Sequence, residues 1–115
     1  MNRIVFILLG VAMIALVFVT GCVESGPSSG SKVYSRDEAF AACQELCRNS
    51  KAAGLDLSEG PCLSNAVVRD WVCDIAHNPR QAVDNMPANQ CEYFLKQEAH
   101  HFIELDENCN FIQSY

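Results

Sequence analysis

The sequence predicts a small disulfide-rich α+β domain, in which two helices pack on a short antiparallel sheet. Three observations indicate this fold class. The chain has 115 residues and seven cysteines, and a small domain rich in cysteine depends on disulfides because its apolar core is thin. Stretches with helical spacing of apolar residues occur beside short stretches that alternate between apolar and polar residues. The chain that follows an apolar N-terminal run has room for one ordinary domain, which we place at residues 35–115.

The N-terminal segment has the features of a secretory signal. Arg3 supplies a short positive head, and residues 4–19 form a run without charged side chains. As a helix this run would be about 24 Å long, less than the ~30 Å hydrocarbon core of a bilayer. We therefore predict a signal peptide over residues 1–21. An uncleaved N-terminal membrane helix is the alternative, and it would also place the body outside the cytoplasm.

The signal segment ends in Val19-Thr20-Gly21-Cys22, which resembles the lipobox of prokaryotic lipoproteins. The resemblance implies cleavage before Cys22 and attachment of a lipid to its thiol. Residues 22–34 are then a flexible linker, because serine, glycine and proline dominate the tract. We expect an exported lipoprotein anchored to the outer face of the cell membrane.

Six further cysteines lie in the body of the chain. An even number in an oxidising compartment predicts three disulfides, although many pairings are open and the sequence selects none. Cys43 and Cys47 lie one helical turn apart on the same face, so we expect each to bond to a different neighbour. The six predicted disulfide cysteines are Cys43, Cys47, Cys62, Cys73, Cys91 and Cys109.

Local signals predict the first helix over residues 36–52. Ser35 and Glu38 have the spacing of a capping box, and Gly54 is placed to end the helix. An apolar stripe of helical period supports this prediction. Its members are Phe40, Cys43, Leu46 and Cys47.

The remaining elements follow from alternation and turn signals. Residues 55–65 are predicted to form a loop because Gly60-Pro61 breaks regular structure. The alternation over residues 71–76 predicts a strand with Asp74 on the side opposite Trp71, Cys73 and Ile75. Residues 101–105 and 111–115 predict a hairpin with Cys109 in its loop.

The stretch Asn89-Gln90-Cys91-Glu92 is predicted to open a second, short helix that runs to about Ala99. Asn89 and Glu92 have the spacing of another capping box. The side facing the domain is predicted to comprise Cys91, Phe94, Leu95 and Glu98.

Composition excludes some classes of function. The formal net charge is -6, and the basic side chains are scattered among acidic ones. Binding of nucleic acid requires clustered Lys and Arg, so we expect no nucleic-acid partner. No assembled active-site motif is evident, which favours a non-enzymatic role without a cofactor.

The polar loop over residues 77–90 is the best candidate for binding. Cys73 and Cys91 flank it and are placed to brace it, so hydrogen-bonding side chains on the loop suit a polar ligand or a surface protein. The alternative is a polar connector whose Asn and Asp side chains complete their own turns. The candidate binding residues are His77, Asn78, Arg80, Gln81, Asp84 and Asn85.

The leading hypothesis is thus a membrane-tethered extracytoplasmic interaction or ligand-binding module. An alternative is a metal-binding or thiol-redox protein that uses Cys43, Cys47, Cys73 and His77, which are ligand types that zinc prefers. A third is an inhibitor of exported hydrolases. The body from Gly60 to Cys109 is also similar to small cysteine-rich exported proteins encoded in archaeal genomes, a resemblance that implies export and no particular activity.

Overall fold

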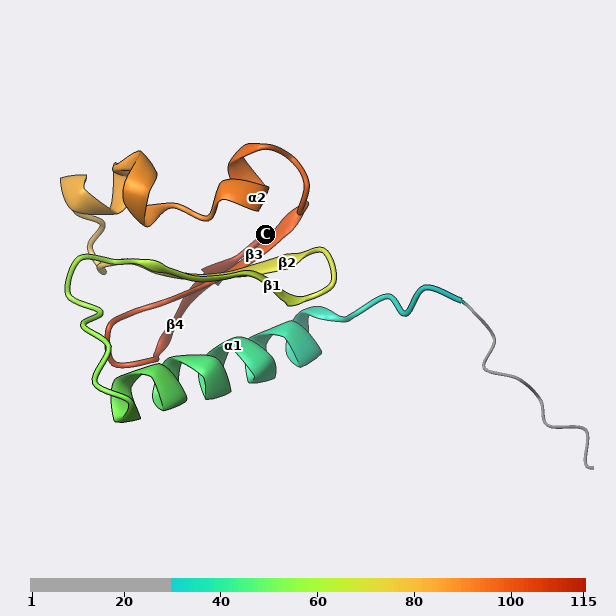
Figure 1. The fold of residues 1–115 in the computed structure, drawn as a ribbon, viewed down its shortest axis with the longest axis horizontal. Helices are drawn as coiled ribbons and strands as arrows, with labels where there is room; N and C mark the ends of the chain where they lie inside the picture. The colour runs from blue at the N-terminus through green and yellow to red at the C-terminus, as the bar shows by residue number, and fades with distance from the viewer. Residues whose placement is uncertain (1–29) are drawn as a thin grey trace, which may run out of the picture.

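The computed structural model of this protein describes residues 30–115 (Figure 1). The predicted signal peptide, Cys22 and the first part of the linker lie outside the described residues. Within residues 30–115, no helix has both the length and the apolar character needed to cross a membrane.

Helix α1 spans Arg36–Ala52 and confirms the predicted first helix. At its N-terminus, the backbone N–H of Glu38 donates to Ser35 Oγ, and the Glu38 carboxylate accepts the backbone N–H of Ser35 at 2.9 Å. At its C-terminus, Gly54 has a φ of 86° and donates its N–H to the carbonyl of Lys51 at 2.9 Å. Both ends are therefore closed by the local chemistry that the sequence predicts.

The four strands form one mixed sheet in the order β1-β2-β3-β4. Their bounds are Cys62–Val68, Trp71–Ile75, His101–Leu105 and Phe111–Ser114. β1 and β4 pair antiparallel with their neighbours, whereas β2 and β3 are parallel. The prediction of an antiparallel sheet is thus wrong for the central pair. The chain that leaves the C-terminal end of β2 passes over one face of the sheet and enters β3 at the end where β2 began. Parallel pairing of two successive strands requires such a crossover connection.

Strand β1 is absent from the sequence prediction, which assigned residues 55–65 to a loop. Gly60-Pro61 does precede the strand, but pairing with β2 begins immediately afterwards at Cys62. The register shifts between Cys62 and Ser64, and again between Ser64 and Val68. These irregularities remove the alternation of apolar and polar side chains that identifies a strand.

The second helix is much shorter than predicted. α2 spans Glu92–Leu95, and its N-cap is Cys91, without a side-chain cap. Asn89 belongs instead to the 3-10 turn η2 (Pro87–Asn89) and donates its side-chain amide to the carbonyl of Val83 at 3.0 Å. The predicted capping box is therefore wrong, because Asn89 is engaged elsewhere.

The predicted inner side of this helix is correct for two of its four residues. Cys91 is buried and Phe94 is half-buried. Leu95 is 54% exposed, and Glu98 is exposed after the single helical turn has ended. The helix ends too early for its side chains to maintain one buried stripe.

The domain has three layers (Figure 1). Helix α1 packs on one face of the sheet, over a core that includes Trp71, Ile75 and Ile103. Residues 76–100, which we call the covering segment, lie on the opposite face and contain η1 (Ala82–Asn85), η2 and α2. A smaller cluster of Val72, Cys91 and Ala99 is buried beneath this segment.

Three disulfides join these layers. Cys43–Cys73 links α1 to β2, and Cys47–Cys109 links α1 to the turn between β3 and β4. The expectation that Cys43 and Cys47 bond to different neighbours is confirmed. Cys62–Cys91 ties the covering segment to β1. In the chain-entropy account, bridges that close loops of this length stabilise the domain by roughly 3–4 kcal/mol each.

Candidate functional site: a carboxyl-lined cleft

A cleft of about 300 Å³ lies between the sheet and the covering segment. Alternate residues of a strand point to one face, so Val72 and Asp74 of β2 reach the cleft together. The parallel register pairs Val72 with Phe102 and Asp74 with Glu104. The residues that line the cleft are Val72, Asp74, Arg80, Gln90, Cys91, Phe94, Leu95, Phe102, Glu104 and Gln113.

The two carboxyl groups that line the cleft, Asp74 and Glu104, belong to neighbouring strands. Glu104 is 5% exposed, and its carboxylate accepts a hydrogen bond from Arg80 Nη1 at 2.8 Å. Gln113 Nε2 donates to the other carboxylate oxygen at 3.4 Å. The negative charge of Glu104 is therefore paired and hydrogen-bonded within the protein.

Asp74 is in a different position. Burial raises the pKa of Asp74 to about 7, and the negative charge of Glu104 adds to this effect. Arg80 acts in the opposite direction but more weakly. Among residues 30–115, no Lys, Arg or His lies within ion-pair distance of the Asp74 carboxylate. Near neutral pH this carboxyl group is consequently divided between its protonated and ionised forms.

Arg80 has little capacity left for a second carboxylate. Besides Glu104, its guanidinium donates to Asn85 Oδ1 at 2.9 Å and to the carbonyl of Asp84 at 3.3 Å. These contacts orient the guanidinium toward Glu104. The cleft thus contains two carboxyl groups and one cationic group.

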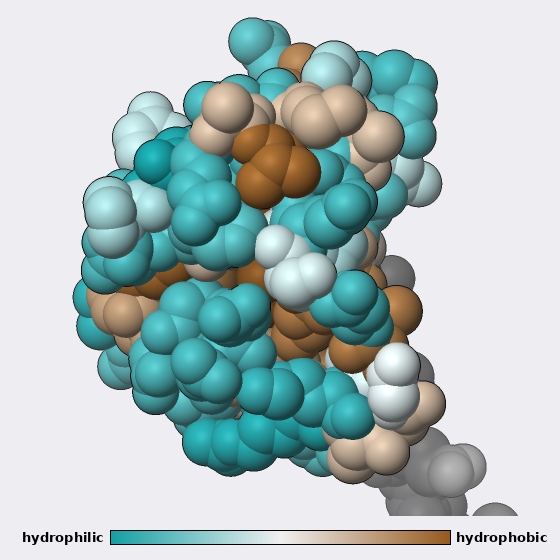
Figure 2. Space-filling view, turned by 90° about the vertical axis from the view of Figure 1, so that its left-hand side faces the viewer, coloured by the Kyte–Doolittle hydropathy of each residue, from teal (hydrophilic) through white to brown (hydrophobic). Residues whose placement is uncertain are grey.

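Part of the cleft lining, which we call the apolar wall, is formed by aromatic rings. The rings of Phe94 and Phe102 meet edge to face, with their centroids 5.1 Å apart. A second and more open hollow of about 690 Å³ shares Phe94 and Leu95 with the cleft. It continues along Ala99 to Tyr115, the last residue of the chain. Figure 2 shows apolar surface in a hollow between hydrophilic surfaces on one side of the molecule.

The predicted binding loop has a mainly structural arrangement. Of its six candidate residues, Arg80 lines the cleft. Asp84 is 1% exposed and accepts hydrogen bonds from the backbone N–H groups of Gln81 at 2.7 Å and His77 at 3.1 Å. His77 Nδ1 lies 2.8 Å from Asp84 Oδ1. Asp84 therefore completes the turn from within, as the alternative interpretation of this loop expects.

The same contacts set the pKa values of this pair. The hydrogen bond to Asp84 raises the pKa of His77. Burial opposes ionisation of Asp84, but hydrogen bonds from Gln81 and His77 outweigh it and lower the pKa of Asp84. The pair is therefore an ionic contact over the acidic to neutral range. Asn78 and Asn85 are exposed, and Asn78 precedes the cis peptide bond to Pro79.

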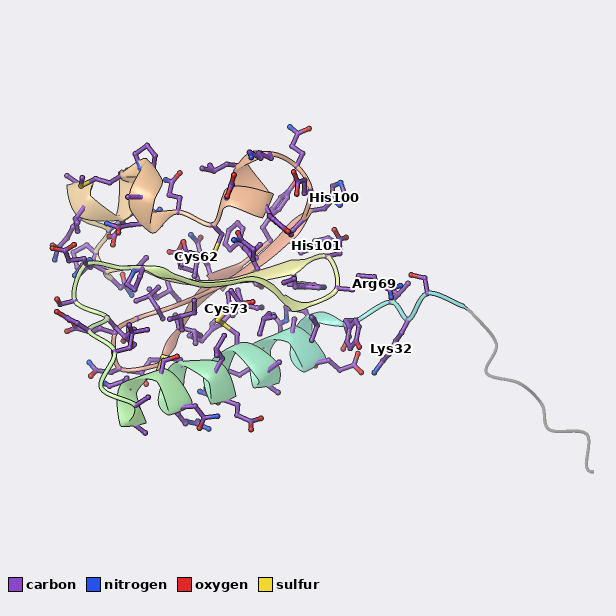
Figure 3. All side chains as sticks on the ribbon, viewed as in Figure 1. Lys32, Cys62, Arg69, Cys73, His100 and His101 are labelled. Atoms are coloured by element: carbon purple, nitrogen blue, oxygen red, sulfur yellow. A yellow bond between two sulfur atoms is a disulfide. The ribbon has the colours of Figure 1, made fainter. Side chains whose placement is uncertain are left out.

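A second cluster of titratable groups lies at the end of the domain that receives the linker (Figure 3). His100 Nδ1 is 2.6 Å from Asp70 Oδ1, and this hydrogen bond lowers the pKa of Asp70. The ring of His101 stacks on Trp71 with a centroid separation of 4.6 Å. These contacts fasten the turn between β1 and β2 to the start of β3.

The four residues considered for a metal or redox centre do not converge. Cys43 and Cys73 are bonded to each other on the side of the sheet that faces α1 (Figure 3). Cys47 is bonded to Cys109, and His77 contacts Asp84. Among residues 30–115, one cluster of cysteine and carboxyl side chains has the spacing of metal ligands. It lies at the cleft, where potential ligand atoms of Cys62, Asp74 and Cys91 are within 4.8 Å of one another. Its two sulfur atoms form the third disulfide.

Sequence reasoning missed most of the cleft. The prediction that Asp74 lies on the side of β2 opposite Cys73 is confirmed, but nothing in the sequence indicated that the covering segment buries that side. Glu104 carried a similar signal, since a single acidic residue interrupts the apolar run Phe102-Ile103-Glu104-Leu105. Asp74 and Glu104 are each the fourth residue of an otherwise mainly apolar strand. This shared position was the signal in the sequence that could have indicated a common carboxyl site.

Comparison with protein-family models, curated proteins and solved structures finds no significant match to this chain. The structure itself defines a small disulfide-rich α+β domain. Three disulfides in so small a domain indicate an oxidising, extracytoplasmic environment.

Proposed function

We propose that this protein is a membrane-tethered, extracytoplasmic module that binds a small ligand in the cleft. The observation that carries the proposal is the cleft itself, whose lining combines apolar side chains with the carboxyl group of Asp74, which has no ion-pair partner within residues 30–115. Ligand sites are concave and mainly apolar, with a few polar groups that orient the ligand, and their volumes are typically about 300–1,000 Å³. The cleft and the adjoining hollow have this character.

The tether is supported by the N-terminal sequence and by the disulfides. The lipobox-like motif at residues 19–22 follows an apolar run of signal length. An extended chain spans up to about 3.5 Å per residue, so a linker from Cys22 to Ser35 would let the domain stand tens of ångströms from the bilayer. We expect a tract rich in serine and glycine to give such a linker the flexibility it needs.

Intact mass spectrometry of the protein purified from membranes tests the tether. A mass that corresponds to a chain starting at Cys22, with added acyl groups and three disulfides, would support the proposal. A chain that starts at Met1 would contradict cleavage and lipidation at Cys22, and six free body thiols would contradict the oxidised domain.

Ligand binding is tested by saturation-transfer NMR on the full-length protein in lipid nanodiscs, with empty nanodiscs as the blank. The probe is 2-phenylethanol, a neutral amphiphile whose ring fits the wall formed by Phe94 and Phe102. We expect saturation transfer to the ring protons. Gln113→Trp should abolish it by filling the cleft from β4, whereas Glu45→Trp on the exposed side of α1 should not. Equal signals from the two variants would contradict the assignment of the site.

A further inference from the structure

We infer that the cleft selects a small primary amine whose ammonium group binds to Asp74 and whose apolar or aromatic body lies on Phe94 and Phe102. This inference rests on the proposed ligand-binding function and specifies the chemistry of its ligand. Two features of the cleft support it, which are the pairing of charges among its lining residues and the aromatic side chains that line it beside Asp74.

The balance of charge in the cleft favours a cation. Asp74 and Glu104 are cross-strand partners, and Arg80 is the cationic side chain among the lining residues. Because Arg80 is committed to Glu104, ionised Asp74 leaves one negative charge without a partner. A ligand ammonium group would supply that partner, and charge-assisted hydrogen bonds are about twice as strong as neutral ones.

The same balance disfavours an anion. A ligand carboxylate would need to displace Glu104 from Arg80, which would leave a side chain that is 5% exposed without its ion-pair partner. Breaking one side of a buried ion pair in this way is strongly unfavourable. A carboxylate would also approach Asp74, where two like charges repel each other.

The aromatic lining of the cleft determines which kind of apolar body the ligand can have. Phe94 and Phe102 stand edge to face beside Val72 on the sheet. The opening continues into the larger hollow through the shared residues Phe94 and Leu95. A compact amine with one aromatic ring would therefore place its ring on Phe94 and Phe102 while its nitrogen reaches Asp74.

Binding of an ammonium group at this position should depend on pH. The groups that face Asp74 are Glu104 from β3, Arg80 and Asp84 from the covering segment, and the uncharged Cys62–Cys91 disulfide. Burial and the charge of Glu104 hold the pKa of Asp74 near 7, so protons compete with a cationic ligand. Affinity for an amine should rise with pH through this range and level off once Asp74 is ionised.

The test compares three probes of similar size, which are phenethylammonium, 2-phenylethanol and 3-phenylpropanoate. Dissociation constants are measured by NMR titration on the full-length protein in lipid nanodiscs at pH 5.5 and pH 8. We expect phenethylammonium to bind about tenfold more tightly than 2-phenylethanol at pH 8, and 3-phenylpropanoate to bind more weakly than both. The preference for the amine should shrink at pH 5.5.

Asp74→Asn provides the matched variant, because it keeps the shape of the side chain and removes its charge. The preference for the amine and its pH dependence should both disappear, while binding of 2-phenylethanol is retained. Glu45→Gln, on the exposed side of α1, should change neither the preference for the amine nor its pH dependence.

The outcomes separate the two levels of the proposal. Equal binding of the three probes, with no pH dependence in the wild type, would overturn the selection of amines and leave the ligand-binding function intact. Failure of all three probes to bind would overturn both. The wild-type pH series decides the inference even if Asp74→Asn does not fold.

Discussion

Asp74 and Glu104 are register partners in the parallel pair β2–β3, and their carboxyl groups face the same cleft. One of the two is neutralised by Arg80, and the other has no ion-pair partner within residues 30–115. A fold that buries a carboxyl group without an ion-pair partner loses stability when that group ionises. This relationship leads to measurable effects of substitution and pH.

Asp74→Asn should stabilise the protein at pH 8 and have little effect at pH 4. The pKa of Asp74 is about 7 in the folded state, against 3.8 for an ordinary Asp. The folded protein therefore binds one more proton than the unfolded chain between these values, and stability falls as pH rises through them. The full difference corresponds to at most about 4 kcal/mol.

Urea unfolding of wild type and Asp74→Asn at both pH values measures this effect. We expect the variant to be about 2–4 kcal/mol more stable at pH 8. Glu45→Gln serves as the control, because Glu45 is exposed on α1. A wild type as stable as the variant at pH 8 would show that Asp74 is not held in an unfavourable site.

Arg80→Gln should destabilise the domain by about 2–3 kcal/mol. It leaves Glu104, whose side chain is 6% exposed, without its cationic partner. Removal of one member of a buried pair costs more than removal of both. The double variant Arg80→Gln/Glu104→Gln should therefore regain part of the lost stability in chemical denaturation. Additive losses from the two single substitutions would contradict this coupling.

The contact between His77 and Asp84 should stabilise the protein most strongly near pH 5. The raised pKa of His77 means that its contribution is complete below 6.5 and is lost as pH rises through its folded value. The lowered pKa of Asp84 means that its contribution is present above 3.8 and is lost as pH falls through its folded value.

A double-mutant cycle with His77→Gln and Asp84→Asn, carried out at pH 5 and pH 9, measures this contribution. We expect a favourable coupling energy at pH 5 and a smaller one at pH 9. Identical coupling at the two pH values would mean that the charge on His77 does not contribute.

Gly60→Ala should destabilise the domain more than Gly54→Ala does. Both glycines have positive φ angles, of 70° and 86°, which are unfavourable for alanine. An added Cβ at Gly60 would lie 2.9 Å from the carbonyl oxygen of Ile75 and even closer to the Asp84 carboxylate. At Gly54 it would meet nothing within 4 Å.

Thermal unfolding of the two glycine variants separates crowding from backbone strain. Gly54→Ala should cost about 1 kcal/mol, since it introduces strain alone. Gly60→Ala should cost about 2–3 kcal/mol, because the backbone carbonyl of Ile75 cannot move aside easily. Equal losses would show that the Gly60 neighbourhood relaxes freely.

The sequence predicted the elements whose determinants are local. Helix α1 follows from Ser35, Glu38, Gly54 and its apolar stripe, all of which act within a few residues. The hairpin around Cys109 and strand β2 were predicted for the same reason. Each of these signals lies within the element that it specifies.

The cleft and the mixed sheet depend on long-range placement. Parallel pairing of β2 with β3 requires the chain from Ala76 to His100 to cross one face of the sheet, and no short motif in that segment encodes the crossing. The environment of Asp74 depends on what the covering segment places above it. Its side of the strand was predictable, whereas its burial was not.

The Cys62–Cys91 disulfide has a mechanical consequence for access to the cleft. The covering segment leaves β2 at Ala76, enters β3 at His101, and is held between these points by a covalent bond to β1. It cannot lift away from the sheet as a hinged flap while that bond is intact. A ligand of the proposed kind would therefore bind in a cleft whose covering segment is already held in place. Reduction of Cys62–Cys91 would free the covering segment from β1. The other two disulfides join α1 to the opposite side of the sheet and would not hold this segment in place.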